Sequence, residues 1–489
     1  MKPFVHQEVG IKLLVENPIF ALFDEMGLGK TKQVIDAAQI LYQQGIVNRV
    51  IIISPAAVRA VWFDEELGEL VKHLFVPSRI TQFHNRLRTW AFMSGDKYLR
   101  WAITNYEYIR NEDHYVVLKQ ICDKKTLLVL DESSAIKSYR AKQSQACLKI
   151  RRRCGRVILL NGTPITQSPM DMFSQGNIMD PQILECPTRY QFIARYAVKG
   201  GFKSKSTVGW RYLEDMQRRF KPFVIRRLKS ECLDLPPKLD PILYTIPLSR
   251  DAWNAYKEMR NEMITWLDEQ NVSIARQAIT KILRLCQVTT GFIGGVEIVG
   301  DTTVKETREI GREKLDFFLG WLDERFEVEK DLRLLVWCRF RAESRRLLKE
   351  LLEKRQNLSR YNNLLIGSII GGQKSKDRAA ALRLLHPDTV PEGPIIVIGS
   401  PQAGSMGLNL AAAHNVFYMS NDHSLKTRLQ SMDRVHRPGQ TYPVSYFDIA
   451  ATGPEGQKTV DHTILKALRA KEDLANWTTK AWIRGLKDE

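Results

Sequence analysis

Residues 19–31 read IFALFDEMGLGKT, an apolar run followed by a glycine-rich turn and a lysine–threonine pair. A strand that leads through such a turn into a helix directs backbone amides and the helix N-terminus toward a phosphate. Gly27 and Gly29 allow close approach of the backbone, and Lys30 is positioned to reach the β- and γ-phosphates. We expect Thr31 to ligate magnesium. The stretch therefore predicts an α/β domain that binds ATP and Mg²⁺.

A second segment, LLVLDESS at 127–134, places Asp131 and Glu132 directly after an apolar strand. Open α/β sheets bind ligands outside the carboxyl ends of their strands. We expect Asp131 to hold magnesium and Glu132 to polarise the attacking water. The alternative is an acidic N-cap of the next helix, and the phosphate loop upstream argues against it.

Short apolar runs recur along the chain, each followed by a turn or a helical pattern. Uninterrupted runs of this kind are typical of strands buried on both faces of a parallel sheet. They form two sets, which predicts an α/β fold of two tandem RecA-like lobes, parallel sheets flanked by helices, with small helical insertions. The expected strands are Ile19–Phe23, Val50–Ile53, Trp101–Ile103, Leu127–Leu130 and Val157–Leu160, then Leu334–Trp337, Leu364–Ile366, Ile395–Ile398, Val416–Met419 and Val444–Phe447.

The less regular middle of the chain separates the two sets. We expect residues 1–225 to form lobe 1, with a helical insertion at about 166–222, and residues 226–489 to form lobe 2. Lobe 2 is expected to carry a helical insertion at about 245–300, the arginine fingers described next and C-terminal helices. Within the middle, Lys199–Gly209 (KGGFKSKSTVG) predicts a surface loop, and Arg250–Gln270 predicts a long helix.

The segment QSMDRVHRPGQ at 430–440 carries two arginines, Arg434 and Arg437, at helical spacing. We expect both to project from one helix face, and Pro438 and Gly439 to end that helix. An arginine pair on a surface is usually solvated. Transfer of a γ-phosphate, however, requires cations where negative charge develops. We therefore expect Arg434 and Arg437 to be arginine fingers of an ATP-driven motor whose two lobes close on nucleotide.

Two further segments leave alternatives open. Leu159–Ile165 (LLNGTPI) is either a simple turn or a sensor of the γ-phosphate. Ser400–Ala413 (SPQAGSMGLNLAAA) contains Gly404 and Gly407, which allow a tight loop after a strand. Such a loop could contact both nucleotide, at Gly407, and a polyanion backbone; the alternative is a glycine-rich connector.

The net charge of +18 favours a polyanionic partner, because phosphate contacts dominate affinity for nucleic acids. Basic clusters occur at 149–156, 226–229 and 339–346. The alternative is a merely soluble basic surface. The seven cysteines are dispersed without a CxxC pair, so neither a zinc site nor a disulfide framework is expected.

The sequence contains no apolar run of about 18 residues, so no membrane span is expected. Its N-terminus, MKPFVHQEVGIKLL, lacks the apolar core of a signal peptide. We expect a cytoplasmic protein of a bacterial or phage-infected cell, or a nuclear one. Nothing in the sequence indicates oligomerisation, so we expect a monomer.

Taken in order, these segments resemble superfamily 2 helicase-like ATPases, and within them the Swi/Snf-like branch of DNA translocases. The likeness runs from about residue 1 to about residue 445. The compact form is similar to bacterial or phage members or to annealing helicases. The matching segments are FVHQ at 4–7, DEMGLGKT at 24–31, ISPAAVRAVW at 53–62, ITNYEYI at 103–109, LDESSAIKS at 130–138, LNGTPI at 160–165, FVIRRLKSECLDLPPK at 223–238, LLVWCRFR at 334–341, AGSMGLNL at 403–410 and QSMDRVHRPGQ at 430–440.

The resemblance implies an adenine-reading role for Gln7 and movement along duplex DNA without obligatory strand separation. DNA contacts would fall mostly on phosphates and would be independent of base sequence. The candidate contacts are Ser54, Arg59, Thr104, Asn105, Arg339, Arg341 and Ser405.

Asp24 stands where a strict phosphate loop has its first glycine, although DEMGLGKT matches the motif of the family nearly unaltered. The chain departs from the family pattern at Asn161, where the branch has threonine. Ser133 and Ser134 replace the Ala-His common after the acidic pair. These changes leave the coupling of hydrolysis to movement open.

Two rival functions share the ATPase site. One is a helicase that separates strands of DNA or RNA, and the other is a remodeller that displaces proteins such as polymerase from DNA. An inactive binding module is disfavoured because the expected catalytic residues are all present. The sequence does not identify a protein partner.

Overall fold

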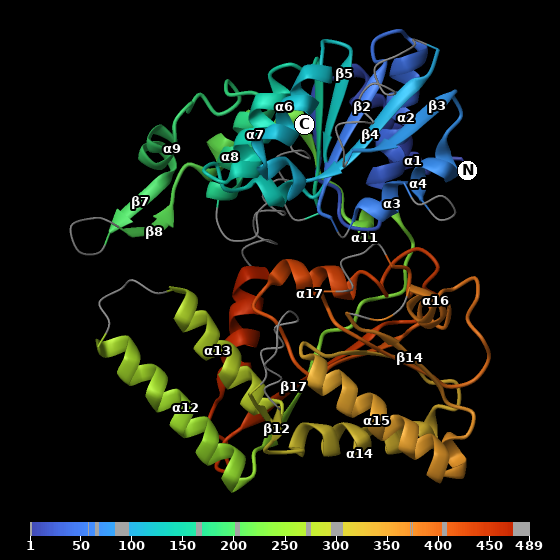
Figure 1. Ribbon diagram of the computed structural model, residues 1–489, viewed down its shortest axis with the longest axis vertical. Helices are drawn as coiled ribbons and strands as arrows, with labels where there is room; N and C mark the ends of the chain where they lie inside the picture. The colour runs from blue at the N-terminus through green and yellow to red at the C-terminus, as the bar shows by residue number, and fades with distance from the viewer. Residues whose placement is uncertain are drawn as a thin grey trace. The chain divides into compact units, whose positions relative to one another are not determined.

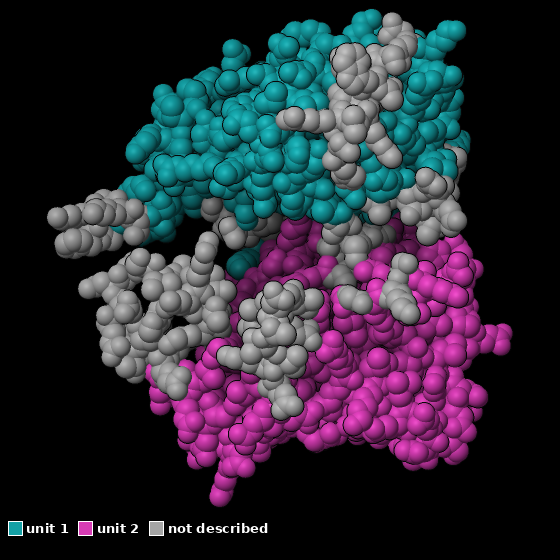
Figure 2. Space-filling model, in the orientation of Figure 1, with its two compact units in different colours: residues 1–234, 471–489 teal, residues 235–470 magenta. Residues whose placement is uncertain are grey.

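The computed structural model divides into two compact units, residues 1–234 with 471–489 and residues 235–470 (Figure 2). It describes residues 2–56, 58–63, 68–83, 97–162, 169–200, 206–269, 275–294, 307–371, 373, 375–402 and 408–472. Each unit has a parallel sheet flanked by helices, which confirms the predicted α/β fold (Figure 1). No helix in these ranges is long and apolar enough to cross a membrane.

Within its described residues, unit 1 contains a seven-stranded parallel sheet of order β3-β4-β2-β5-β6-β1-β9. Because all strands run the same way, the chain leaves each of them at the same edge of the sheet. The first expected set is confirmed, whereas β3 and β9 were not predicted. The strands are β1 Ile19–Leu22, β2 Arg49–Ser54, β3 Ser78–Gln82, β4 Leu99–Asn105, β5 Thr126–Leu130, β6 Arg156–Leu160 and β9 Val224–Ile225.

Both faces of this sheet are buried, as the uninterrupted apolar runs predicted. Ile51 and Ile53 of β2 belong to one core, and Val50 and Ile52 belong to the other. The first core includes α6 (Glu112–Ile121), α7 (Lys142–Arg151) and α8 (Met170–Met179). The second includes α1 (Val5–Glu16), α2 (Lys30–Gln43) and α4 (Glu69–His73), while the short α3 (Arg59–Phe63) contributes Trp62.

After α8, unit 1 continues through α9 (Arg189–Tyr196) and the strands β7 (Ala197–Gly200) and β8 (Ser206–Trp210) to α10 (Leu213–Phe220). The prediction of a surface loop at 199–209 was therefore wrong at both ends. Lys199 pairs with Thr207 in an antiparallel ladder. Gly200 allows this pairing because a Cβ there would lie 2.9 Å from the Val208 side chain.

Within its described residues, unit 2 contains a six-stranded parallel sheet of order β10-β17-β16-β13-β15-β14. Every pairing in it is parallel, from Ile242 beside Phe447 to Leu365 beside Ile395. The second expected set is confirmed, and β10 is an additional edge strand. The strands are β10 Ile242–Pro247, β13 Arg333–Trp337, β14 Leu365–Ile369, β15 Ile395–Gly399, β16 Asn415–Tyr418 and β17 Ser445–Thr452.

The unit 2 sheet is also buried on both faces. Leu334 and Val336 of β13 point into one core, and Leu335 and Trp337 point into the other. The expected long helix is confirmed as α12, Arg250–Glu269. The remaining elements are α13 Ala275–Thr289, β11 Phe292–Ile293, β12 Arg308–Glu309, α14 Glu313–Val328, α15 Arg341–Asn357, α16 Ser375–Arg383 and α17 Leu425–Met432, and residues 460–472 are helical.

The division between the units falls after Asp234, nine residues beyond the expected lobe boundary at 225. The intervening segment, which includes α11 (Lys229–Cys232), stays with unit 1 because its backbone continues the pairing begun by β9. Phe23 N donates to Ile225 O at 2.9 Å, and Glu25 N donates to Arg227 O at 2.9 Å.

Candidate functional site

The phosphate loop connects β1 to α2, as the sequence predicted, and α2 begins at Lys30, one residue earlier than expected. Gly29 is the N-cap of α2 and has a φ of 70°, and Gly27 has a φ of 90°. A Cβ on Gly29 would lie 2.2 Å from Gln7 Nε2. Backbone conformation and close approach both require glycine at position 29.

The donors of this loop fit the phosphates of ATP. Lys30 Nζ lies over the loop, where it donates to Asp24 O at 2.7 Å and to Glu25 O at 3.1 Å. Within the described part of the chain, the amides of Gly27 and Gly29 donate no hydrogen bond. A flexible ammonium, amides that need an acceptor and the start of a fourteen-residue helix together form an anion site.

The start of α1 packs against the phosphate loop. His6 Nε2 lies 3.1 Å from Leu28 O, and Gln7 Nε2 donates to the same carbonyl at 3.4 Å. Both side chains are buried. Gln7, expected to read adenine, is therefore held directly beside Gly29.

A buried ion pair supports the loop from beneath. Asp24, fully buried, accepts from Arg227 Nε at 2.9 Å through Oδ1 and from Arg227 Nη2 through Oδ2. Arg227 also donates to the backbone carbonyl of His6 and, at 3.0 Å, to Gln33 Oε1. The network thus joins α1, the phosphate loop, α2 and the segment after β9. The glycine-to-aspartate departure at position 24 is its centre.

The acidic pair follows β5, at the same edge of the sheet as the phosphate loop. Asp131 Oδ2 accepts from Trp62 Nε1 at 2.8 Å, and Asp131 Oδ1 accepts from Glu132 N at 2.8 Å. Burial raises the pKa of Asp131 to about 6, and the Glu132 carboxylate adds to the rise. The Trp62 hydrogen bond and the charge of Lys30 oppose it.

Glu132 has a left-handed backbone conformation with a φ of 50°. Such a conformation is uncommon outside glycine and is found at functional sites, where the surrounding structure maintains it. The surroundings here are η3 (Ser133–Ile136) and α8, which are joined because Ser133 Oγ donates to Gln175 Oε1 at 2.6 Å.

Thr31 and Asp131 are the residues that would hold magnesium. In the described ranges, no group of three or more His, Cys, Asp and Glu residues could hold a metal ion. Magnesium suits this arrangement, because it usually takes one or two protein ligands and completes its octahedron with water and phosphate oxygens.

The basic cluster at 226–229 points largely inward, which corrects its reading as polyanion-binding surface. The cluster at 149–156 is mixed: Arg156 is buried, whereas Lys149, Arg152 and Arg153 are exposed. Arg226 Nη1 donates to Phe23 O at 3.0 Å and to Gly162 O at 3.1 Å, and burial lowers its pKa to about 10. Arg156 Nη2 donates to three backbone carbonyls around the end of α1. Their charges therefore stabilise unit 1.

In unit 2, the expected helix through Arg434 and Arg437 is not formed. Helix α17 ends at Met432. The carbonyl of Arg434 accepts from Leu410 N at 2.9 Å, and Pro438, four residues further on, has no N–H that could extend the helical ladder to it. Arg437 Nη1 donates to Leu408 O at 2.7 Å. Both arginines lie in the turn after α17, and Gly439 closes this turn with a φ of 99°.

The DNA-contact candidates of unit 1 lie at or just beyond the ends of β2 and β4. Ser54 and Thr104 are fully buried, and Thr104 Oγ1 donates to Phe83 O at 3.2 Å. Asn105 Oδ1 accepts from Tyr108 N at 2.7 Å. These three side chains position the backbone of this sheet edge. Arg59, in α3, lies over the Phe63 ring with 5.5 Å between its guanidinium carbon and the ring centroid.

The candidates of unit 2 border a cavity of about 330 Å³ at the start of α15, lined by Arg339, Arg341, Arg345 and Thr290 among others. Arg339 is partly neutralised by Asp422, 3.6 Å away, and donates to Asn421 O. Arg341 and Arg345 are exposed. The third basic cluster thus presents charge to solvent, as part of the first does.

Two of the expected contact residues, Ser405 and Gly407, lie outside the described residues, as does the Thr163–Ile165 part of the LNGTPI segment.

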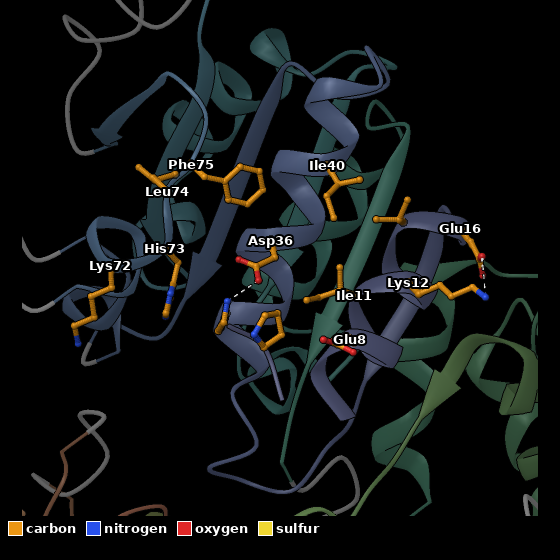
Figure 3. A pocket seen from close by; sticks show the side chains of 13 residues that line it. Glu8, Ile11, Lys12, Glu16, Asp36, Ile40, Lys72, His73, Leu74 and Phe75 are labelled. Atoms are coloured by element: carbon orange, nitrogen blue, oxygen red, sulfur yellow. Dashed lines mark hydrogen bonds and ion pairs between the residues drawn. The ribbon is translucent and has the colours of Figure 1, made fainter. Parts of the chain in front are cut away.

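A hollow of about 660 Å³ lies beside the phosphate loop on the outer side of α1 and α2 (Figure 3). Its lining is mainly apolar, with Ile11, Ile40 and Phe75, and contains a buried ion pair of 2.6 Å between Lys32 and Asp36. Lys30, Asp131 and Glu132 do not line it. This hollow is therefore separate from the expected ATPase residues.

Family models account for most of the chain. One described as "SNF2-related domain" matches residues 6–290, and one described as "Helicase conserved C-terminal domain" matches residues 313–439. The chain belongs to the SNF2-related family. This confirms the resemblance that the ordered motifs indicated.

Curated SNF2-type relatives align with nearly the whole chain. "Probable ATP-dependent DNA helicase CHR12" of Arabidopsis thaliana is 26% identical, with 92% of this chain and 39% of the relative covered. "Uncharacterized ATP-dependent helicase MG018" of Mycoplasma genitalium is 24% identical, with 97% and 42% covered. The chain thus spans about two fifths of the length of these relatives.

A solved structure described as "Sulfolobus solfataricus SWI2/SNF2 ATPase core in complex with dsDNA" is 20% identical. It aligns over 100% of this chain and 97% of its own, with a TM-score of 0.42. The family assignment rests on the domain models.

The Asp24–Arg227 pair predicts a large and asymmetric effect on stability. We expect Arg227→Met to lower the free energy of unfolding of unit 1 by about 3–5 kcal/mol, because it leaves a buried carboxylate without its cation. Adding Asp24→Asn should recover part of this loss, because the amide carries no charge. Urea denaturation of the three variants and wild type measures both effects.

The control is Lys12→Met, which removes an exposed pair with Glu16 at 3.9 Å and should change stability by less than about 1 kcal/mol. An Arg227→Met variant no less stable than Lys12→Met would show that the buried pair does not support the loop.

The raised pKa of Asp131 predicts a pH-dependent stability in the absence of ATP and magnesium. The folded state holds the proton more tightly than the unfolded chain, so wild type should lose stability as pH rises from about 4 to 6. Asp131→Asn cannot ionise and should lack this loss. The variant should therefore gain about 1–3 kcal/mol over wild type across this window, measured by urea denaturation. Parallel pH profiles would contradict the assigned pKa.

Proposed function

We propose that this SNF2-family chain is a DNA-stimulated ATPase that moves along duplex DNA. We propose that this movement serves fork remodelling, branch migration or strand annealing. The observation that carries the proposal is the convergence of a complete phosphate loop and an acidic pair on one sheet edge, in a chain that matches both family models. The relatives described as ATP-dependent helicases support ATP as the nucleotide.

In this proposal, Lys30 exchanges its two loop carbonyls for phosphate oxygens, and Gln7 reads the base. Thr31 and Asp131 hold magnesium, which neutralises charge on the phosphates when bound. Glu132 accepts a proton from the attacking water. Its left-handed backbone turns its side chain away from the direction that a continuing strand would impose.

Arg434 and Arg437 are proposed to stabilise the negative charge that develops during phosphoryl transfer. Their place in a turn held at both ends favours this role. Leu410 N binds the carbonyl of Arg434, and Gln440 Nε2 donates to Val435 O at 3.3 Å and to Ala413 O at 2.7 Å. A turn fixed in this way limits the side-chain positions that must be ordered for catalysis.

The DNA partner is proposed from charge and position. The exposed Arg341, the partly paired Arg339 and Arg59 offer guanidinium groups to backbone phosphates, while Ser54, Thr104 and Asn105 shape the sheet edge. Contacts of this kind are independent of base sequence and weaken steeply with salt. Ser405 and Gly407 remain proposed contacts to DNA and nucleotide.

The proposal is tested by the steady-state rate of ATP hydrolysis with no nucleic acid, duplex DNA, a model fork, single-stranded DNA or RNA. We expect duplex or fork DNA to give the largest stimulation, because the proposed contacts recognise a duplex backbone. Stimulation by single strands or RNA alone would favour a strand-separating helicase. A rate unaffected by any nucleic acid would favour a remodeller that a protein partner triggers.

Two variants separate the roles within the ATPase site. Lys30→Ala should lower hydrolysis by at least about 100-fold with duplex binding intact, because a preorganised charge at the phosphates is lost. Arg437→Ala should slow turnover by about 1,000-fold with little change in ATP affinity, as for loss of an arginine finger.

Lys12→Ala, which removes an exposed lysine of α1, is the matched control and should keep the wild-type rate. Turnover retained by Lys30→Ala would overturn the phosphate-loop assignment. A large loss of ATP affinity at unchanged turnover in Arg437→Ala would remove its finger role.

A further inference from the structure

Unit 1 contains a basic cavity that none of the motif assignments uses. Its volume is about 390 Å³, and it lies between the turn after η3, the start of α8 and the start of α9. Lys137 and Arg140 come from the turn, and Arg189 is the first residue of α9. Three cations from two distant stretches of sequence therefore surround one hollow.

The lining of the cavity combines the three cations with one carboxylate, Asp171 on α8. Lys137 and Asp171 have partners of their own. Arg140 and Arg189 are exposed, and neither forms a hydrogen bond or ion pair with any described residue. Arg227 and Arg156, in contrast, bind a carboxylate or backbone carbonyls. Two guanidinium groups thus remain available for an external anion.

The floor of the cavity is rigid. The Tyr139 and Phe173 rings pack with centroids 5.4 Å apart, and Phe173 is fully buried. The turn itself is fixed because Gln145 Nε2 donates to Tyr139 O at 2.6 Å and Ala141 N donates to Ser138 O at 3.0 Å. A site that is already ordered loses less conformational entropy when it binds a ligand.

The cavity also adjoins the acidic pair. Its turn follows η3, which begins at the residue after Glu132. The Ser133–Gln175 hydrogen bond joins η3 to α8, and α8 is one wall of the cavity. An anion bound in the cavity would contact the structure that positions the proposed general base.

We propose that this cavity binds a backbone phosphate of the nucleic acid, an inference that rests on the proposed function. Guanidinium groups suit a phosphodiester because their planar donors pair with two phosphate oxygens at once. The partly aromatic floor accommodates the attached sugar. The cavity therefore adds a phosphate contact of unit 1 to those expected at the motif residues.

The test compares wild type with Arg140→Ala/Arg189→Ala. Duplex binding is followed by fluorescence anisotropy over a salt series, and hydrolysis is followed against DNA concentration. We expect about tenfold weaker binding and a slope of log affinity against log salt that is shallower by about 1, the value for one lost phosphate contact. The DNA concentration for half-maximal stimulation should rise in parallel, with the DNA-free rate unchanged.

The matched control is Arg152→Ala/Arg153→Ala, which removes two exposed arginines at the opposite end of α7 from this turn. This control should keep the wild-type slope. Arg140→Glu should weaken binding more than Arg140→Ala, because it places a like charge beside the phosphate. A slope unchanged by the Arg140/Arg189 double substitution, or changed equally by the control, would overturn the phosphate site.

Two further outcomes separate this inference from the proposed function. Wild type that binds no duplex would overturn both. Duplex binding with an unchanged slope in the cavity variant would overturn the cavity alone. The last measurement is duplex binding by wild type and the cavity variant in the presence of inorganic phosphate at constant ionic strength. If phosphate lowers the affinity of wild type for DNA toward that of the cavity variant and leaves the variant unchanged, phosphate and DNA compete for the cavity, as we expect. If phosphate binds wild type but not the variant and leaves the DNA affinity of wild type unchanged, the cavity is a free-phosphate site and its assignment to nucleic acid fails.

Discussion

The phosphate loop of this protein depends on the buried ion pair between Asp24 and Arg227. A carboxylate with no exposed surface is stable only when a cation and hydrogen bonds replace its hydration. Arg227 supplies both, and it reaches Asp24 from a segment 203 residues further along the chain. The same guanidinium binds the carbonyl of His6 and the side chain of Gln33. One arginine thereby fixes the position of α1, the loop and α2 relative to one another.

The electrostatics of the acidic pair follow from its place beside this loop. Burial and the neighbouring Glu132 favour the protonated form of Asp131, whereas Trp62 and the charge of Lys30 favour the ionised form. The resulting pKa of about 6 leaves Asp131 mostly ionised at neutral pH, as a magnesium ligand must be. Lys30 therefore has a second effect beside its proposed contact with phosphate, because its charge favours the ionised form of Asp131. The turn after η3 connects the acidic pair to the basic cavity.

Sequence patterns predicted local structure well and side-chain partners poorly. Continuous apolar runs identified the ten expected strands, because strands buried on both faces require them. The same reasoning missed β9 and β10, which are a two-residue strand and a half-exposed edge strand. Arg226 and Arg227 were interpreted as exposed charge, because the residues next to a basic cluster in the sequence do not show which distant carbonyls and carboxylates bind it. The helix expected through Arg434 ends at Met432, and a distant amide, Leu410 N, binds the Arg434 carbonyl in the turn that follows.

The sequence by itself determined the fold class and the family and predicted the nucleotide-binding residues, because these rest on periodicity and on glycine, lysine and carboxylate spacings that are local. Only the tertiary structure decided which charged side chains are paired or hydrogen-bonded inside the protein and which face solvent. Arg227 and Arg156 are neutralised or bound by partners far away in the chain, whereas Arg140 and Arg189 meet at one cavity without a partner among the described residues. Such pairings depend on how distant segments pack, and no spacing along the chain encodes them.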